Sequence, residues 1–204
     1  MKLSTPTDIS NKFKGMQSLV NQSMDSENYL FARDKLTGLS CWAEIDAQLK
    51  THNLQARPLK RSDFDNGYLE LLAQLTIVGE ITREEFLSRF DSMKLINEAI
   101  EHYLVVVIED LETKKLIAAS TLCLELKFIH RCAVRARLEE VVVHETHRGK
   151  RIGEKIVRII VCLADEVCKS YKISLDCTDE LLKFYERNGF THRSNMVSVR
   201  FDRY

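Results

Sequence analysis

The chain has 204 residues, of which 45% are hydrophobic and 29% charged, a balance typical of one globular domain with a substantial core. Its 30 basic and 30 acidic side chains cancel, so the composition gives no support for non-specific nucleic-acid binding. No apolar run approaches the roughly 20 residues of a membrane span, and the first residues lack the pattern of a secretory signal. We therefore expect a soluble, cytoplasmic protein with no membrane span and no nucleic-acid partner.

The cysteines argue against a disulfide framework and against a metal site. No two of the six form a CxxC pair, and most fall in segments that we expect to be strands or core helices. They are Cys41, Cys123, Cys132, Cys162, Cys168 and Cys177. Their distribution predicts reduced, mostly buried thiols and no bound metal.

Composition divides the chain near residue 55. Residues 1–54 are rich in Ser, Thr, Asn and Lys, and we expect a partly disordered or loosely helical N-terminal extension there. Arg57-Pro58 cannot lie inside a helix and predicts the entry into the first core strand. Residues 55–204 would then form a single domain.

Two helices are expected first in this domain. Apolar residues at helical spacing predict a helix over residues 62–78, with Ser62 or Asp63 as its cap. A second helix over 82–98 begins with Thr82 and Glu85, which match a capping box.

The character of the chain then changes to β-branched, apolar runs. Strands are predicted at 103–110 and 115–128, joined as a hairpin, and at 138–143, 171–177 and 196–201. Helices are predicted between the later strands, at 149–169 and 180–189. This order predicts a mixed α/β (α+β) fold in which helices flank one sheet.

The turn RGKRIG, Arg148 to Gly153, joins a predicted strand to the start of a helix. The first turn of a helix has unpaired N–H groups and a partial positive charge, which attract phosphate oxygens. Arg148, Lys150 and Arg151 add charge, while Gly149 and Gly153 permit close approach of the backbone. Taken alone, the turn fits a solvated strand-to-helix connection as well as it fits an anion site.

The order of elements and the RGKRIG turn resemble the GNAT superfamily of acyl-CoA-dependent N-acetyltransferases. The segments RPLKRSDFDNGYLELLAQLTIVG, LKFIH, LEEVVV, RGKRIG, YKISLDC and FYERNGF are similar, in order and spacing, to glucosamine 6-phosphate N-acetyltransferases. The resemblance covers about residues 55–204 and implies a GNAT-type, largely antiparallel, twisted sheet flanked by helices. It also implies direct acetyl transfer from acetyl-CoA to D-glucosamine 6-phosphate, without a metal, in UDP-N-acetylglucosamine synthesis.

The resemblance assigns the coenzyme site to a strand, the basic turn and a helix. Backbone groups of the valine run would pair with the pantetheine arm, and the turn would hold the pyrophosphate. The residues so implied are Val141, Val142, Val143, Arg148, Gly149, Lys150, Arg151, Ile152, Gly153, Tyr185, Glu186 and Arg187. Many relatives have glycine where this chain has Arg151, and we expect a helical backbone there that accepts a side chain.

The resemblance also assigns the chemistry. Tyr185 would donate a proton to the leaving thiolate, and Glu139, Glu140 and Asp176 would orient the amino sugar. Because neighbouring strand residues point to opposite faces, Glu139 and Glu140 would have different roles. The implied residues of the sugar-phosphate site are Thr76, Lys127, Phe128, Ile129, His130, Glu139, Glu140, Tyr171, Lys172 and Arg200. In the family a second subunit completes this site, so a homodimer is implied.

Two positions depart from the family pattern, and two other functions stay open. Leu181 stands where many relatives have a coenzyme-binding asparagine, and Ala136 where a glycine is expected in a turn before LEEVVV. The alternatives are an acetyltransferase for a peptide, lysine or polyamine, and a CoA-binding relative without turnover. Cys177 carries a further hypothesis, a mixed disulfide with CoA under oxidation.

Overall fold

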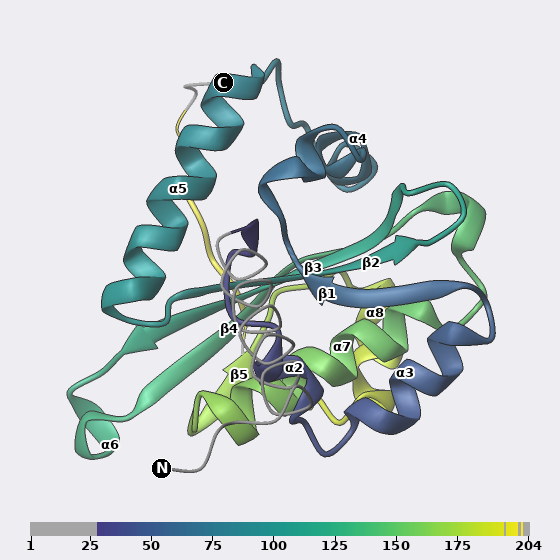
Figure 1. The fold of residues 1–204 in the computed structure, drawn as a ribbon. Coiled ribbons are helices and arrows are strands. Elements are labelled where there is room, and N and C mark those ends of the chain that lie inside the picture. Colours follow the sequence, from purple (N-terminus) through teal and green to yellow (C-terminus); the bar gives the residue numbers. More distant parts are fainter. Residues whose placement is uncertain (1–27, 194, 200, 202–204) are drawn as a thin grey trace, which may run out of the picture.

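The computed structural model describes residues 28–193, 195–199 and 201 (Figure 1). Its sheet has five strands in the order β1 (Leu54–Pro58), β2 (Tyr103–Asp110), β3 (Leu116–Leu126), β4 (Val134–Val143) and β5 (Lys172–Ser174). The first three pairings are antiparallel, and β4 pairs with β5 in parallel. The predicted mixed, largely antiparallel sheet is confirmed.

Helices cover both faces of this sheet (Figure 1). One face carries α4 (Tyr68–Leu72) and α5 (Arg83–Ala99), and the other carries α3 (Trp42–Lys50), α7 (Ile152–Cys162) and α8 (Asp179–Arg187). The shorter elements are α2 (Asp34–Thr37), α6 (Ile129–Cys132), the 3-10 turns η1 (Arg61–Phe64) and η2 (Glu145–His147), and the π-helical turn η3 (Leu163–Val167).

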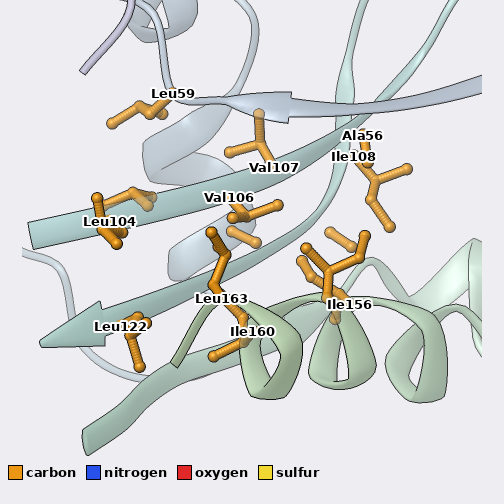
Figure 2. Packing of buried hydrophobic residues seen from close by; sticks show 14 of the residues in the cluster. Ala56, Leu59, Leu104, Val106, Val107, Ile108, Leu122, Ile156, Ile160 and Leu163 are labelled. Atoms are coloured by element: carbon orange, nitrogen blue, oxygen red, sulfur yellow. The ribbon is translucent and has the colours of Figure 1, made fainter. Parts of the chain in front are cut away.

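The packing of α7 against the sheet fixes the start of that helix. Ile156, Ile159 and Ile160 are fully buried, and Figure 2 shows Ile156, Ile160 and Leu163 directed toward the side chains of β2 and β3. Removing one such side chain, for example Ile160→Ala, costs about 2–5 kcal/mol of stability. The RGKRIG turn is therefore held in place by the core beneath it.

Part of the segment before residue 55 also lies in this core. Trp42, Ile45 and Leu49 of α3 belong to the same buried cluster as the sheet residues. Arg158 of α7 forms an ion pair with Glu44 of α3 at 2.9 Å. The division of the chain at residue 54 stays a prediction.

Several predicted elements are confirmed. Helix α5 begins after Thr82, whose hydroxyl accepts from the Glu85 N–H at 3.2 Å, while the Glu85 carboxylate accepts from the Thr82 N–H at 2.8 Å. Strand β2 has the predicted bounds, and the 149–169 region contains the expected amphipathic helix. Here the local pattern and the tertiary packing favour the same structure.

Other elements differ from the prediction. The single helix at 62–78 is wrong, because Gly67 at φ +86° separates η1 from α4. Strand β1 ends at Pro58 instead of beginning there. Because β1 is an edge strand, proline is tolerated at its end although it has no N–H to donate to a neighbouring strand.

The C-terminal part of the domain is less regular than predicted. Helix α7 ends at Cys162 and continues as a π-helical turn, and β5 has three residues where seven were expected. The strand predicted at 196–201 does not form at residues 196–199 and 201, which pair with no strand among the described residues. A strand needs a neighbour for its N–H and C=O groups, and this segment is exposed instead.

Candidate active site

A β-bulge lies in the middle of β4. Ala119 of β3 pairs with Val142 and Thr121 pairs with Glu139, so β4 carries an extra residue between these pairs. Glu140, within the bulge, has φ +56°. The regular alternation of faces that we expected at Glu139 and Glu140 is therefore wrong, because a bulge re-aims the side chains around it. The contacts of the two carboxylates nevertheless differ.

One hydroxyl holds the Glu140 carboxylate. The Thr121 hydroxyl donates to Glu140 Oε2 at 2.7 Å. Thr121 is 4% exposed, so this hydrogen bond forms largely out of contact with water. Burial raises the pKa of Tyr68, and the Glu140 carboxylate adds to that shift.

Arg137 brings Glu139 and Asp176 together. Its Nε donates to Glu139 Oε1 at 2.7 Å, and its Nη2 donates to Asp176 Oδ2 on the loop after β5. Hydrogen bonds to both carboxylates raise the pKa of the guanidinium. The sequence prediction missed Arg137. Its position two residues before Glu139, on the same face of a regular strand, is the signal that points to it.

Beyond this cluster, β4 and β5 separate. Pairing between them covers residues 135–137 and 172–174, while β4 continues to Val143 with no β5 partner among the described residues. Such an edge accepts an extended ligand through backbone hydrogen bonds. The predicted valine run lies on it. The Val143 carbonyl is already engaged, because Arg148 Nε donates to it at 3.1 Å.

Tyr185 lies in α8 among aromatic rings. It is 8% exposed, and its ring centroid lies 5.0 Å from that of Phe184 and 5.7 Å from that of Phe190. Burial, with a smaller contribution from Cys177, raises the pKa of Tyr185 to about 12. The phenol is therefore protonated at neutral pH, as a proton donor must be.

Cys177 follows Asp176 on the loop after β5. Burial and the acidic neighbours Asp179 and Asp176 raise the pKa of this thiol. A raised pKa lowers the fraction of reactive thiolate. The mixed disulfide with CoA stays a hypothesis that this environment does not favour.

The RGKRIG turn has two residues in left-handed backbone conformations. Gly149 has φ +77°, and Arg151, the residue before α7, has φ +57°. The helical conformation expected for Arg151 is therefore wrong, and a non-glycine residue there costs about 1–2 kcal/mol. A Cβ on Gly153 would lie 3.3 Å from the Phe184 ring, so this glycine allows α7 to approach α8 closely. The amides of Ile152 and Gly153 stand in the first turn of α7, where no intrahelical acceptor exists.

Four of the predicted sugar-phosphate residues gather at the far end of β3 and the start of β5. Lys127 pairs with Glu125, and the His130 ring lies 4.5 Å from the Tyr171 ring, over which Lys172 Nζ sits at 5.8 Å. Phe128 and Ile129 beside them are exposed, at 98% and 59%. We call Lys127, His130, Tyr171 and Lys172 the basic end cluster.

The structure does not bring all predicted acceptor residues together in one chain. Lys127 lies six residues along β3 from Thr121, about 20 Å in an extended strand. Thr76 lies just after α4, in a segment held near η2 because Gln74 Oε1 accepts from the Glu145 N–H at 2.9 Å. Figure 1 shows α4 well away from α6, which contains His130. Arg200 lies outside the described residues.

The two departures occupy defined positions. Leu181 lies on α8 and is 46% exposed. Ala136 is fully buried within β4, paired with Leu124 and Ile173. The expectation of a turn at Ala136 is wrong, because β4 begins at Val134 and is longer than predicted.

The described residues contain no group of three or more His, Cys, Asp or Glu side chains able to hold a metal ion. None of their helices has the length and apolarity needed to cross a bilayer.

The sheet that opens beside a bulge, followed by a basic turn at a helix start, defines an acetyltransferase of the GNAT class. Accordingly, residues 100–192 match the model of the acetyltransferase (GNAT) domain. A crystal structure of glucosamine-6-phosphate N-acetyltransferase from Arabidopsis thaliana superposes with a TM-score of 0.69 at 35% identity, covering 73% of this chain and 99% of that one.

Two curated relatives narrow the class. The chain is 48% identical over 152 residues to a probable glucosamine 6-phosphate N-acetyltransferase of Drosophila melanogaster, covering 73% of this chain and 67% of that protein. It is 36% identical over 143 residues to glucosamine 6-phosphate N-acetyltransferase 1 of Dictyostelium discoideum, covering 70% and 88%. The chain belongs to the glucosamine 6-phosphate N-acetyltransferase family.

Proposed function

We propose that this protein transfers the acetyl group of acetyl-CoA to the amine of D-glucosamine 6-phosphate, giving N-acetyl-D-glucosamine 6-phosphate and CoA. The observation that carries the proposal is the cluster at the β4 bulge. There Arg137 joins Glu139 to Asp176, and Thr121 holds Glu140, beside the open edge of β4. Carboxylates so placed accept hydrogen bonds from the amine and hydroxyls of an amino sugar.

The reaction needs no covalent enzyme intermediate. The neutral amine attacks the thioester carbonyl, the C–N bond forms, and the C–S bond breaks as the tetrahedral intermediate collapses. Tyr185, protonated because burial raises its pKa to about 12, donates its proton to the departing thiolate. The amine proton passes to water or to a carboxylate of the cluster. Holding both substrates together supplies much of the acceleration.

The coenzyme residues fit their proposed ligand. The open edge of Val141 and Val142 suits the amides of pantetheine, and the first turn of α7 suits the pyrophosphate. Arg148 and Lys150, both exposed beside that turn, add positive charge. Acetyl-CoA acts here as a co-substrate that brings the activated acetyl group.

We propose further that two copies of the chain build each acceptor site. The basic end cluster lies about 20 Å along β3 from Thr121, which is longer than a hexose phosphate. We therefore place the phosphate of each substrate at the basic end cluster of one chain and its amine at the carboxylates of the other chain. Exposed apolar side chains near the cluster and the C-terminus, at Phe128, Ile129, Val197 and Val199, suit a surface between subunits.

The reaction is tested by CoA release from acetyl-CoA, with glucosamine 6-phosphate and glucosamine compared as acceptors. We expect release with the phosphate ester and a much higher KM, or no release, with the free sugar. Release with a peptide, lysine or polyamine alone would assign the protein to another amine, and CoA binding without turnover would make it a non-catalytic relative. We place the product in UDP-N-acetylglucosamine synthesis in the cytoplasm.

A further inference from the structure

Two cysteines from distant parts of the sequence lie near each other where α7 ends. Cys41 is the residue just before α3, and Cys162 is the last residue of α7. Cys41 is buried, at 3% exposed, and Cys162 is half-buried. Neither is among the residues proposed for acetyl transfer, so any role of this pair is separate from that reaction.

The Cys41 sulfur lies beside the helical turn that contains Cys162. Cys41 Sγ is 4.0 Å from the carbonyl oxygen of Arg158. In an α-helix this carbonyl faces the N–H of the residue four positions later, which is Cys162. Side chains of a helix also tilt toward its N-terminus, so the Cys162 thiol lies over the turn of Arg158. The two sulfur atoms are therefore neighbours.

The electrostatics of this region agree with that placement. Burial, and after it the Cys162 thiol, raise the pKa of Cys41 to about 12. Ser40 and, to a smaller degree, the Cys162 thiol lower the pKa of Glu166, four residues after Cys162. Cys162 thus lies within interaction range of both Cys41 and Glu166.

Ser40 fixes the position of Cys41 against this end of α7. The Ser40 N–H donates to Glu166 Oε2 at 2.8 Å, and its hydroxyl donates to Oε1 of the same carboxylate. On either side of Ser40 and Cys41, the side chains of Leu39 and Trp42 are buried in the core. A disulfide forms only when two thiols are held in a narrow range of positions, and these contacts restrain Cys41 in that way.

We propose that Cys41 and Cys162 form a reversible disulfide when the protein meets a peroxide. The Cys162 sulfur attacks one oxygen of hydrogen peroxide, the O–O bond breaks, and a sulfenic acid and water form. The Cys41 sulfur then attacks the sulfenic sulfur, the S–S bond forms, and the S–O bond breaks. The departing hydroxide takes the Cys41 proton. The two thiols lose two electrons and two protons in total, and one peroxide becomes two waters.

The environment of each thiol sets the order of these steps. Cys162 reacts first because it is the more exposed of the two, whereas burial and a raised pKa protect Cys41 from direct attack. Small thiols reverse the disulfide by exchange. The bond closes a loop of more than 100 residues and joins the segment before β1 to α7, so it should stabilise the fold.

The bond is tested by peptide mapping of the full chain after treatment with hydrogen peroxide and alkylation of the remaining thiols. We expect a linked pair of peptides containing Cys41 and Cys162, which dithiothreitol separates. The tryptic peptide 159–169 contains both Cys162 and Cys168, so the mapping is repeated in Cys168→Ala, where the link should persist. No link, a link from Cys41 to Cys168, or Cys162 recovered as sulfinic acid beside an unlinked Cys41 would overturn the proposal.

Thermal unfolding provides a second measurement, in which each oxidised protein is compared with its own reduced form. Oxidation should raise the Tm of the wild type and of Cys168→Ala by about 5 °C or more, as for a cross-link across a long loop. Cys41→Ala and Cys162→Ala should show no such rise. Equal rises in all four proteins would assign the stabilisation to another oxidation and overturn the proposal. Acetyl transfer by the reduced variants should equal that of the wild type, so the two proposals fail independently.

Discussion

The proposed coenzyme half and the proposed acceptor half of this site are built in different ways. Most of the coenzyme half comes from one stretch, residues 141–153, and it depends on the backbone of β4 and on the first turn of α7. The acceptor half is dispersed over β3, β4, the loop after β5 and the basic end cluster, and it depends on side chains. One chain supplies every residue proposed for the coenzyme half, whereas the residues proposed for the acceptor half extend over about 20 Å, farther than one sugar phosphate reaches.

This difference has a physical cause. Amides at a helix start and carbonyls at an open strand edge exist wherever those elements form, so a local segment suffices. Carboxylates and cations instead need partners that fix their direction, such as Arg137 for Glu139 and Thr121 for Glu140. We therefore expect substitutions in the acceptor half and at Tyr185 to change turnover more than substitutions in the turn.

The largest effect is expected at Tyr185, the proposed proton donor. Tyr185→Phe keeps the ring among Phe184 and Phe190 but removes the proton donor, and kcat should fall by about 10²-fold or more. Calorimetry should show CoA binding within about twofold of the wild type, since a phenol that meets only the leaving thiolate adds little to ground-state binding. Equal kcat in wild type and variant would remove Tyr185 from the chemistry.

The pH profile provides a second measurement on Tyr185. The active form is the protonated phenol, and burial raises its pKa from the usual value of about 10 to about 12. The proton is thus retained through pH 10, and it is lost only as the pH rises toward 12. We expect kcat to stay level between about pH 8 and 10. A decrease centred near pH 10 would show an unperturbed phenol.

The next largest effect concerns the proposed division of the acceptor half between two chains. His130→Ala should disable the basic end cluster and Tyr185→Phe the chemistry, so each variant alone should be nearly inactive. Co-expression of the two variants in equal amounts should give about half mixed dimers, which contain one chain of each variant. In a mixed dimer one of the two sites has both substitutions and the other has neither. The mixture should therefore recover about a quarter of wild-type activity.

If each site is complete within one chain, the mixture should recover no activity, because each variant chain lacks either His130 or the Tyr185 hydroxyl. Size-exclusion chromatography with light scattering identifies the dimer in the same samples. A purely monomeric protein with full wild-type activity would contradict the shared site.

The sequence carries more local signal for the proposed coenzyme half than for the proposed acceptor half. The valine strand, the basic turn and Tyr185 carry local signals, and α5 and β2 formed where capping and β-branched runs placed them. Arg137 was missed because its role depends on Asp176, a residue 39 positions away that only the parallel pairing of β4 and β5 brings near. A run such as LEEVVV also carries no clear signal for a bulge. The prediction that Glu139 and Glu140 point to opposite faces of the sheet was therefore wrong.

Backbone conformation was the other source of error. Gly67 divides the first predicted helix, and Arg151 adopts a left-handed conformation that a helical pattern hides. Both positions depend on how the chain enters a packed helix, which is set by the core and not by local propensity. The segment at 196–199 has a strand pattern but no described neighbour, and periodicity cannot supply a partner.

A smaller effect is expected for the hydroxyl that orients Glu140. Thr121→Val removes the donor to Glu140 while conserving shape, and the KM for glucosamine 6-phosphate should rise by about tenfold. Thr121→Ser retains the hydroxyl and should restore most of the affinity. Steady-state kinetics at fixed acetyl-CoA make the measurement. Equal KM values for valine and serine would show that the hydroxyl has no role in acceptor binding.

The smallest effect is expected in the turn, and it concerns stability. Arg151→Gly relieves about 1–2 kcal/mol of left-handed strain but adds about 0.4–1 kcal/mol of chain entropy to the unfolded state. The Arg151–Glu154 ion pair contributes little, because the arginine side chain is 77% exposed. A net gain of about 0.5–1 kcal/mol should raise Tm by about 1–4 °C in calorimetry. Lys150→Gly, at a neighbour without a positive φ, should lower Tm instead, since glycine there brings only the entropy cost. A lower Tm in both variants would mean that Arg151 contributes more through its side chain than its backbone conformation costs.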